Sequence, residues 1–308
     1  MKKSYILLTM AALLTACGHR VSKTDGNNSE GADTAEVATC AEVSAFQTDS
    51  IGLEHEDSMA SVTICVDWPA AGNKALTDSI RQYICEELAT IPYEESEAEV
   101  KLFDDGTKAV KAAIAMQYRA LADTWREAKE AGIPHDMAYS FYQHIFKGDE
   151  GKNYITYHSN NEGFTGGAHG YANSGGITFR KSDGRRIGYR RHINLEKECD
   201  DLLDQMLFSQ PESPQLAALL KEGVRSYFKQ FDEETALDDE QLKETLIGVD
   251  DINRIPLPST PPVFTEEGLG FIYQQYEIAP YAAGMPNFVI PYDKVRPFLT
   301  KDAQSLIE

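Results

Sequence analysis

The chain has 308 residues, of which 42% are hydrophobic, and this is enough for a substantial core in one large domain or two small ones. Its 29 basic and 49 acidic side chains give a formal net charge of -20, which argues against binding to nucleic acid, because phosphates require clustered Lys and Arg. The same charge favours solubility and a cationic partner.

The first residues have the pattern of a bacterial export signal. Lys2 and Lys3 precede the apolar run YILLTMAALLTA, which is shorter than the roughly 20 residues that a membrane-spanning helix needs. The run leads into the letters LTAC, which resemble the lipobox of bacterial lipoproteins. We therefore expect a signal peptide over residues 1–17, lipidation of Cys17, and a cell-envelope protein held outside the cytoplasm by its lipid.

Four further cysteines follow: Cys40, Cys65, Cys85 and Cys199. In an oxidising compartment an even number permits disulfides, and four cysteines allow three pairings. The sequence does not choose among these pairings, and buried free thiols are an equal alternative.

Residues 18–55 have the composition of a flexible tether. The stretch GHRVSKTDGNNSEGADTAEVAT is rich in Gly, Ser, Thr, Asn and Asp and has no periodic apolar pattern. We therefore place the start of the folded region near residue 56.

The first half of the folded region combines strands with two helices. SVTICVDW alternates apolar and polar side chains and predicts a half-buried strand. Apolar residues at helical spacing predict helices from about residue 76 to just before Pro92 and over about 107–131. AYSFYQHIF and NYITYHSN predict two strands joined by KGDEGK, and ITFRKSDGRRIGY predicts a hairpin that turns at Asp183-Gly184.

The second half is expected to contain helices over about 194–208 and 213–231. GLGFIYQQYEIAPYAAGMPNFVIPYDKV then predicts two strands around a loop, followed by a short helix. This order predicts an α+β fold, an antiparallel sheet with helices packed on one face, and two halves joined near residues 164–180.

The stretch FTGGAHGYANSGG, residues 164–176, contains five glycines and His169. It lacks the Lys and hydroxyl residues of a phosphate-binding loop, and it is not the GxSxG of a nucleophile elbow. Gly166, Gly167 and Gly170 therefore indicate a tight structural corner between strands, with a ligand-contacting loop as the alternative.

The histidines do not have metal-ligand spacing. His144, His158, His169 and His192 fall on or beside predicted strands, and the chain has no HxxxH, HExxH or CxxC pattern. We expect ordinary strand-face histidines, no metal site and no cofactor.

YEIAPYAAG, residues 276–284, places Glu277 among apolar residues. A carboxyl group in such surroundings can have a raised pKa and serve acid chemistry, but general acid–base catalysis needs a second group that the sequence does not supply. We favour a bend residue that accepts backbone hydrogen bonds, and we assign no catalytic residue.

Two of these stretches together resemble a known family. FTGGAHG followed by a hairpin ending in SDGRR, and then QYEIAPYAAGMPNFVIPYDKV, resemble the extracellular domain of RsiV-type anti-sigma factors and exported lipoproteins with domain of unknown function 3298. The segment up to GGAHG resembles the domain that precedes the catalytic part of PdaC-type peptidoglycan deacetylases. The resemblance implies a PdaC/RsiV-like α+β domain at 56–180 and an RsiV C-terminal-like α+β domain at 181–308.

The resemblance implies a binding module. RsiV-type domains are known for recognising lysozyme, but this chain has a lipobox in place of a transmembrane helix and a sigma-binding segment. We therefore expect a lipid-anchored envelope protein that binds a cationic protein such as lysozyme, or peptidoglycan. The alternatives are a peptidoglycan- or glycan-acting enzyme and a structural envelope lipoprotein. The candidate ligand-contacting or fold-defining residues are Gly166, Gly167, His169, Gly170, Tyr276, Glu277, Pro280 and Tyr281.

Overall fold

The computed structural model describes residues 45–91, 100–133, 137–188, 205–230 and 237–308. The expected signal peptide and lipidation site lie outside these residues, as does most of the helix expected over about 194–208. None of the described helices is both long and apolar enough to cross a membrane.

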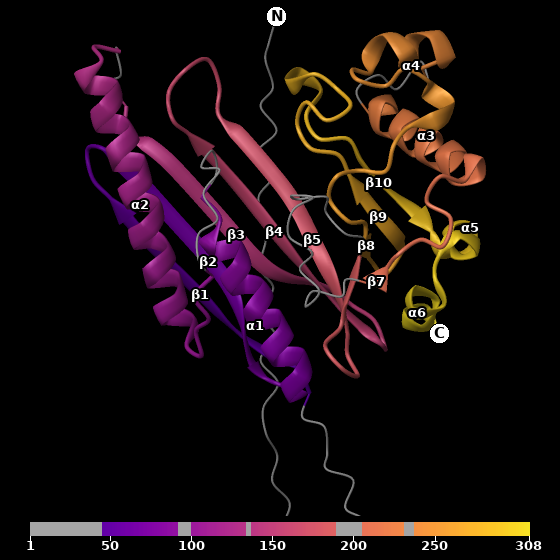
Figure 1. The fold of residues 1–308 in the computed structure, drawn as a ribbon, viewed down its shortest axis with the longest axis horizontal. Coiled ribbons are helices and arrows are strands. Elements are labelled where there is room, and N and C mark those ends of the chain that lie inside the picture. Colours follow the sequence, from indigo (N-terminus) through magenta and orange to yellow (C-terminus); the bar gives the residue numbers. More distant parts are fainter. Residues whose placement is uncertain (1–44, 92–99, 134–136, 189–204, 231–236) are drawn as a thin grey trace, which may run out of the picture. The chain divides into compact units, whose positions relative to one another are not determined.

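A seven-stranded sheet organises most of the chain (Figure 1), and its strands are hydrogen-bonded in sequence order. These strands are β1 (Gln47–Glu56), β2 (Ala60–Ala71), β3 (Tyr139–Glu150), β4 (Tyr154–Phe164), β5 (Tyr171–Arg180), β6 (Arg186–Gly188) and β7 (Gln205–Met206). The turn between β5 and β6 contains Asp183-Gly184, as predicted, and Gly184 has a φ of 72°.

The sheet is mixed, which corrects the expectation of an antiparallel sheet. Strands β2 and β3 are parallel, as are β6 and β7, while the other neighbours in this sheet are antiparallel. The physical reason is that α1 (Lys74–Ala89) and α2 (Gly106–Glu130) lie between β2 and β3 and carry the chain back to the starting edge, as a parallel crossover requires.

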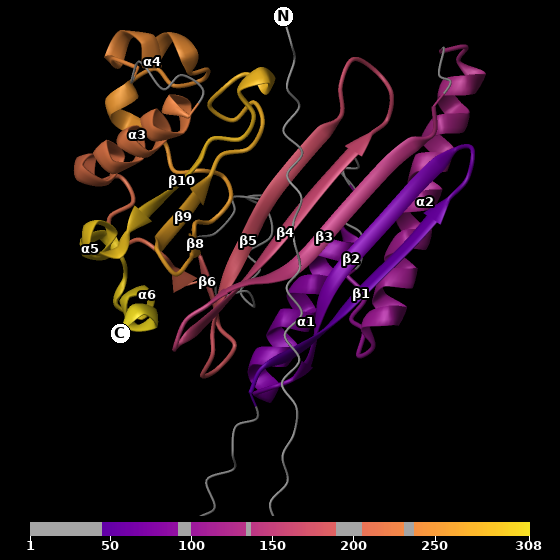
Figure 2. The same cartoon turned by 180° about the vertical axis from the view of Figure 1, so that it is seen from behind.

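Helices α1 and α2 cover one face of this sheet, in front of it in Figure 1 and behind it in Figure 2. Val62, Ile64 and Val66 point into this core and are at most 1% exposed. The alternate residues of β2, which include Thr63 and Cys65, face the other side and are only partly buried. The strict alternation in SVTICVDW therefore predicted both the strand and its buried face.

A second core follows in the chain, around a three-stranded antiparallel sheet of order β10-β9-β8. Its strands are β8 (Val263–Phe264), β9 (Gly268–Ile272) and β10 (Asn287–Pro291). Its α-helices are α3 (Pro214–Lys229), α4 (Asp239–Thr245), α5 (Tyr292–Val295) and α6 (Lys301–Gln304), and short 3-10 turns occupy Ile252–Arg254, Tyr281–Ala283, Arg296–Phe298 and Ser305–Ile307. The α+β class is confirmed.

The two cores meet where β8 crosses β4 and β5. The Thr156 hydroxyl donates to the carbonyl oxygen of Phe264 at 2.7 Å, and the Phe264 N–H donates to the Thr178 hydroxyl at 3.0 Å. Both threonines are fully buried. The small sheet thus packs on the face opposite α1 and α2, and covers only one end of it.

The predicted end of the tether, at residue 55, was wrong, because β1 occupies Gln47–Glu56. This edge strand has one neighbour, and Ile51 and Leu53 are the aliphatic side chains that it packs against the first core. Because β1 buries so few apolar side chains, its composition resembles that of a loop. Gln205–Met206, at the end of the expected helix over 194–208, is a strand as well.

Cys65 and Cys85 are free thiols. Cys65 lies on the face of β2 that points away from α1 and α2, and Cys85 is buried in α1. Cys40 and Cys199 lie outside the described residues.

Candidate functional site

Two stretches that the sequence singled out lie side by side. One is the connection between β4 and β5, and the other is loop 273–286 between β9 and β10. Strand β5 pairs with β6 only at Thr178 and Phe179, so the remainder of this edge of β5 has no strand neighbour among the described residues. Glutamine side chains of the loop take that place.

Gln274 and Gln275 attach the loop to β5. The backbone N–H of Ala172 donates to Gln275 Oε1 at 3.1 Å, and that of Ser174 donates to Gln274 Oε1 at 3.1 Å. Gln274 Nε2 donates in return to the carbonyl oxygen of Ser174 at 2.6 Å. The loop is therefore fixed to the first sheet by side chains that mimic a neighbouring strand.

Three rings from the two stretches form what we call the aromatic platform: His169, Tyr276 and Tyr281. The His169 ring stacks on that of Tyr281, with centroids 3.9 Å apart and an interplanar angle of 22°. His169 Nδ1 lies 2.9 Å from the carbonyl oxygen of Gly170, which can only accept, so in the neutral ring Nδ1 carries the proton. Nε2 is then the acceptor for the Tyr276 hydroxyl at 3.4 Å.

The conformation of the backbone beneath the platform explains why glycines occupy positions 166, 167 and 170. Gly166 and Gly167 have φ values of 91° and 88°, which side chains rarely adopt. A Cβ atom on Gly170 would lie 2.6 Å from the carbonyl oxygen of Gly163. This geometry is that of the predicted corner, and it leaves the contact of His169 with a ligand as a prediction.

Tyr276 has a strained backbone conformation and an exposed side chain. It is the one non-glycine residue with a positive φ among those that the structure describes, at 64°, and it is 55% exposed. Glu277 stabilises the bend at Tyr276. Its carboxylate accepts hydrogen bonds from the N–H of Ser259 at 2.5 Å and from the N–H of Gln274 at 2.7 Å. The interpretation of Glu277 as a bend residue is confirmed. Pro280 directly precedes the 3-10 turn Tyr281–Ala283 and accepts the N–H of Ala283 at 2.8 Å.

A pocket of about 400 Å³ opens beside the platform, on the face of the sheet opposite α1 and α2; we call it the sheet-face pocket. Strands β2, β3 and β4 form its floor, and Tyr281 forms part of its wall. It is lined by Ser61, Thr63, Ser140, Phe141, Tyr142, Glu162, Gly163, Phe164, Gly170, Tyr171, Ala172 and Tyr281. Sequence reasoning missed its strand residues, although the polar positions of SVTICVDW already indicated an open face.

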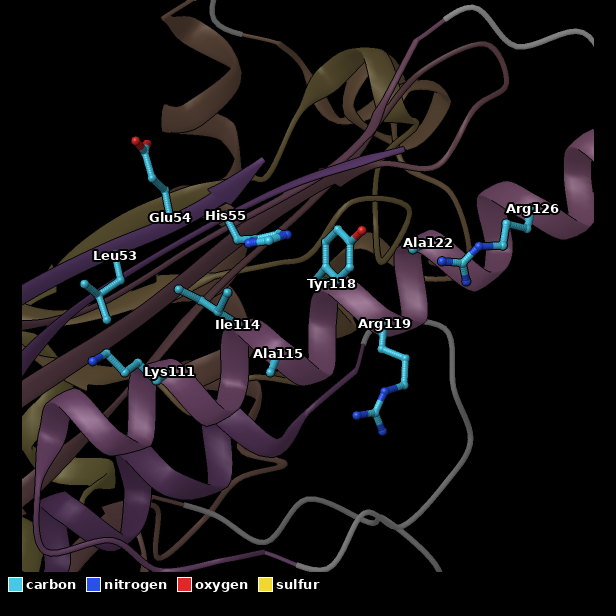
Figure 3. Close-up of a pocket in the computed structure, with 10 residues that line it drawn as sticks. All are labelled: Leu53, Glu54, His55, Lys111, Ile114, Ala115, Tyr118, Arg119, Ala122 and Arg126. Carbon is cyan, nitrogen blue, oxygen red and sulfur yellow. The ribbon is translucent and has the colours of Figure 1, made fainter. Parts of the chain in front are cut away.

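A second pocket, of about 570 Å³, lies between β1 and α2 (Figure 3). His55 and Tyr118 contact each other edge to face in its lining, with ring centroids 4.3 Å apart, and the Tyr118 hydroxyl donates to Asp57 Oδ2 at 2.6 Å. That hydrogen bond, together with the N–H groups of Ala60 and Met59, lowers the pKa of Asp57. Figure 3 shows Glu54 pointing away from α2. This pocket could not be predicted, because β1 lies in the stretch that was expected to be part of the tether.

The titratable groups of the described residues do not assemble a recognisable catalytic or metal centre. Each pocket is lined by one carboxylate, Glu54 or Glu162. His144 and His158 lie on one face of the sheet, and each stacks on Phe146, at 4.6 and 5.2 Å between ring centroids. No group of His, Cys, Asp and Glu in the described ranges could hold a metal ion; His192 falls outside them.

Residues 205–293 match the family described as "Protein of unknown function (DUF3298)". The chain contains a DUF3298 domain. Solved structures of DUF3298 proteins share its fold. One, from Bacteroides fragilis NCTC 9343, is 21% identical with a TM-score of 0.62, over 86% of this chain and 97% of its own. Another, from Pseudomonas aeruginosa PAO1, is 14% identical with a TM-score of 0.52, over 84% of this chain and 96% of its own. No curated protein matches the chain.

The DUF3298 domain supplies only part of the candidate site. It begins at β7 and includes loop 273–286, and therefore Tyr276 and Tyr281. His169 and Glu162 precede it in the chain. The platform and the sheet-face pocket thus lie where the DUF3298 domain meets the strands before it.

Proposed function

We propose that this protein is an envelope binding module, anchored by lipid on Cys17, that recognises a cationic extracytoplasmic protein through the aromatic platform. The observation that carries the proposal is that His169 and Tyr281, more than a hundred residues apart in the chain, stack at an exposed corner. A lysozyme-like protein is the partner that the RsiV-type resemblance implies.

The platform has the character of a contact surface. Tyr is enriched at protein interfaces because it combines a large apolar ring with a polar end and loses little conformational entropy. Tyr276 contributes nothing to the buried core, since it is 55% exposed, and its backbone is held in a costly conformation by the hydrogen bonds of Glu277. Strain of this kind is concentrated at functional sites.

The charge of the chain favours a basic partner. A net charge of -20 attracts a cationic protein over distances comparable with the Debye length, about 10 Å at 0.1 M salt. The LTAC motif supports attachment to a membrane, where such a module would meet proteins that attack the cell envelope. No specific observation favours the enzyme alternative: glycoside hydrolysis needs a pair of carboxylates, and each pocket offers one.

Calorimetry with lysozyme tests the proposal. We expect the chain from residue 18 onward to form a complex at moderate salt and to protect bacteria from lysis by lysozyme. Tyr281→Ala should weaken binding at least about tenfold, as expected for an interface anchor. Leu102→Ala, at an exposed apolar residue away from the platform, should not. Absence of both a complex and protection would reject lysozyme as the partner.

Replacement of Tyr276 by Asn separates binding from folding. Asn tolerates a positive φ better than Tyr, so the free energy of unfolding should stay the same or rise by up to about 1 kcal/mol. Lysozyme affinity should fall, because the ring is lost. Tyr276→Phe keeps both the ring and the strain and should match the wild type in urea unfolding. If Tyr276→Asn keeps full affinity, Tyr276 does not belong to the binding surface.

A further inference from the structure

We infer that the sheet-face pocket receives one basic side chain of the protein ligand, an arginine or a lysine. The inference rests on the proposed function and names the group that the ligand places beside the aromatic platform.

The floor of the pocket is a row of side chains across three strands. Thr63 of β2 is opposite Tyr142 of β3, and Tyr142 is opposite Glu162 of β4. Strands lie about 4.8 Å apart, so neighbouring members of the row are close enough to act on one ligand group. Ser61 and Ser140 form a second row beside it. Tyr281 reaches this floor from the DUF3298 domain, which makes the pocket continuous with the platform.

Glu162 is the one charged group among the lining residues of this pocket. It takes part in no ion pair and no side-chain hydrogen bond with any described residue, and it is exposed, so its carboxylate is open to a ligand. Burial, followed by the charges of Cys65 and Glu162, raises the pKa of Tyr142 above its ordinary value. A carboxylate without a counter-ion in a hollow selects a cation.

The remaining lining groups suit a guanidinium or ammonium group. Such a group donates hydrogen bonds and accepts none. The hydroxyls of Ser61, Thr63 and Ser140 make no hydrogen bond with the described residues, so their lone pairs are available as acceptors beside the carboxylate. The pocket also includes the rings of Tyr142, which is 38% exposed, and Tyr281. Cations bind favourably over such rings, and arginine is a frequent anchor at protein interfaces.

Other occupants fit less well. An anion would meet Glu162 with no basic side chain in the lining, in a chain that is already strongly acidic. A neutral sugar would be satisfied by the hydroxyls and rings alone and would not need the carboxylate. The dependence of binding on Glu162 therefore decides between a basic side chain and a sugar.

The test is calorimetric titration of the chain from residue 18 onward with small probes up to about 10 mM. N-acetyl-arginine amide should bind, and N-acetyl-citrulline amide, which has nearly the same shape without the charge, should bind at least about tenfold more weakly. Glu162→Gln should reduce the arginine affinity at least about tenfold and should weaken the lysozyme complex. Glu54→Gln is the matched control, because Glu54 belongs to the same row on the same face but lies outside this pocket.

Several results would overturn the inference. They are equal binding of the two probes, no binding of either, an arginine affinity unchanged in Glu162→Gln, or binding of N-acetylglucosamine alone. A lysozyme complex that forms without any arginine binding rejects the pocket and leaves the proposed function in place. Arginine binding that depends on Glu162, together with an unchanged lysozyme affinity in Glu162→Gln, shows a cation site that the partner does not use and also rejects the inference.

Discussion

At the scale of single residues, His158 makes the stability of the fold sensitive to pH. It lies on β4 near the point where β8 covers the sheet, and its ring stacks on Phe146. Burial lowers its pKa, an effect that the charge of Asp149 and a backbone hydrogen bond with Gly175 only partly offset. His144 also stacks on Phe146. The folded state therefore holds His158 neutral at a pH where the unfolded chain would bind a proton.

The sign of this dependence follows from proton binding. Because the unfolded state binds the proton more readily, the contribution of His158 to stability is complete above its ordinary pKa of about 6.5 and is lost as pH falls toward the lower, folded pKa. Melting temperatures measured between pH 8 and 5 should fall for the wild type and fall less for His158→Gln. His144→Gln leaves His158 in place and should keep the wild-type slope. Parallel profiles for the wild type and His158→Gln would contradict the argument.

Residue types predicted some of the candidate site but not its assembly. Glu277 was identified as an acceptor of backbone hydrogen bonds because a carboxylate among apolar residues in a bend needs such partners. The glycines at 166 and 167 predicted a corner because they permit a positive φ. The stacking of His169 on Tyr281 was not predictable, because it depends on how Gln274 and Gln275 attach a distant loop to β5.

At the scale of elements, the start of α2 shows packing overriding helix propensity. Gly106 is the first residue of the helix, and Asp105 before it caps the N–H of Lys108 at 2.8 Å. A Cβ atom on Gly106 would lie 2.6 Å from both Ile51 of β1 and the indole of Trp68 on β2. The absence of a side chain allows α2 to approach the edge of the sheet.

Gly106→Ala should therefore destabilise the protein even though alanine favours helices. The gain in propensity is at most about 1 kcal/mol. Overpacking against the buried Trp68 costs about 1–3 kcal/mol, so we expect a net loss in the free energy of unfolding, measured by urea titration. Thr107→Ala, at the exposed neighbouring position, has no such contact and should change stability by less than about 0.5 kcal/mol. A more stable Gly106→Ala variant would show that Trp68 and Ile51 move aside freely.

The elements with strong periodicity were predicted well, and those fixed by tertiary contacts were not. The long amphipathic helix expected over 107–131 is α2, because its apolar residues recur on the face that packs against β2. Strand β1 was missed because an edge strand buries little. The direction of β3 relative to β2 was missed because periodicity identifies strands but not their pairing, which α1 and α2 determine here.

At the scale of the whole molecule, net charge and local ion pairs act on stability in opposite directions. The net charge of -20 destabilises the folded state through self-repulsion, and salt screens that repulsion. Ion pairs such as Arg186–Glu86, with 12% and 24% of the side chains exposed, stabilise it and are screened less, because they are partly buried. Surface pairs such as Arg126–Asp123 contribute little at any salt concentration.

Salt should therefore stabilise the fold while it weakens the complex. Between about 20 and 200 mM NaCl the Debye length falls from roughly 20 Å to 7 Å. Over this range the melting temperature of the free chain should rise, and its affinity for lysozyme should fall, because the attraction between acidic module and basic partner is screened. Arginine-amide affinity should fall as well, while the affinity of the citrulline probe should not change. A melting temperature that falls with salt would mean that the ion pairs outweigh the self-repulsion. A lysozyme affinity independent of salt would mean that the acidic charge of the chain has no part in choosing its partner.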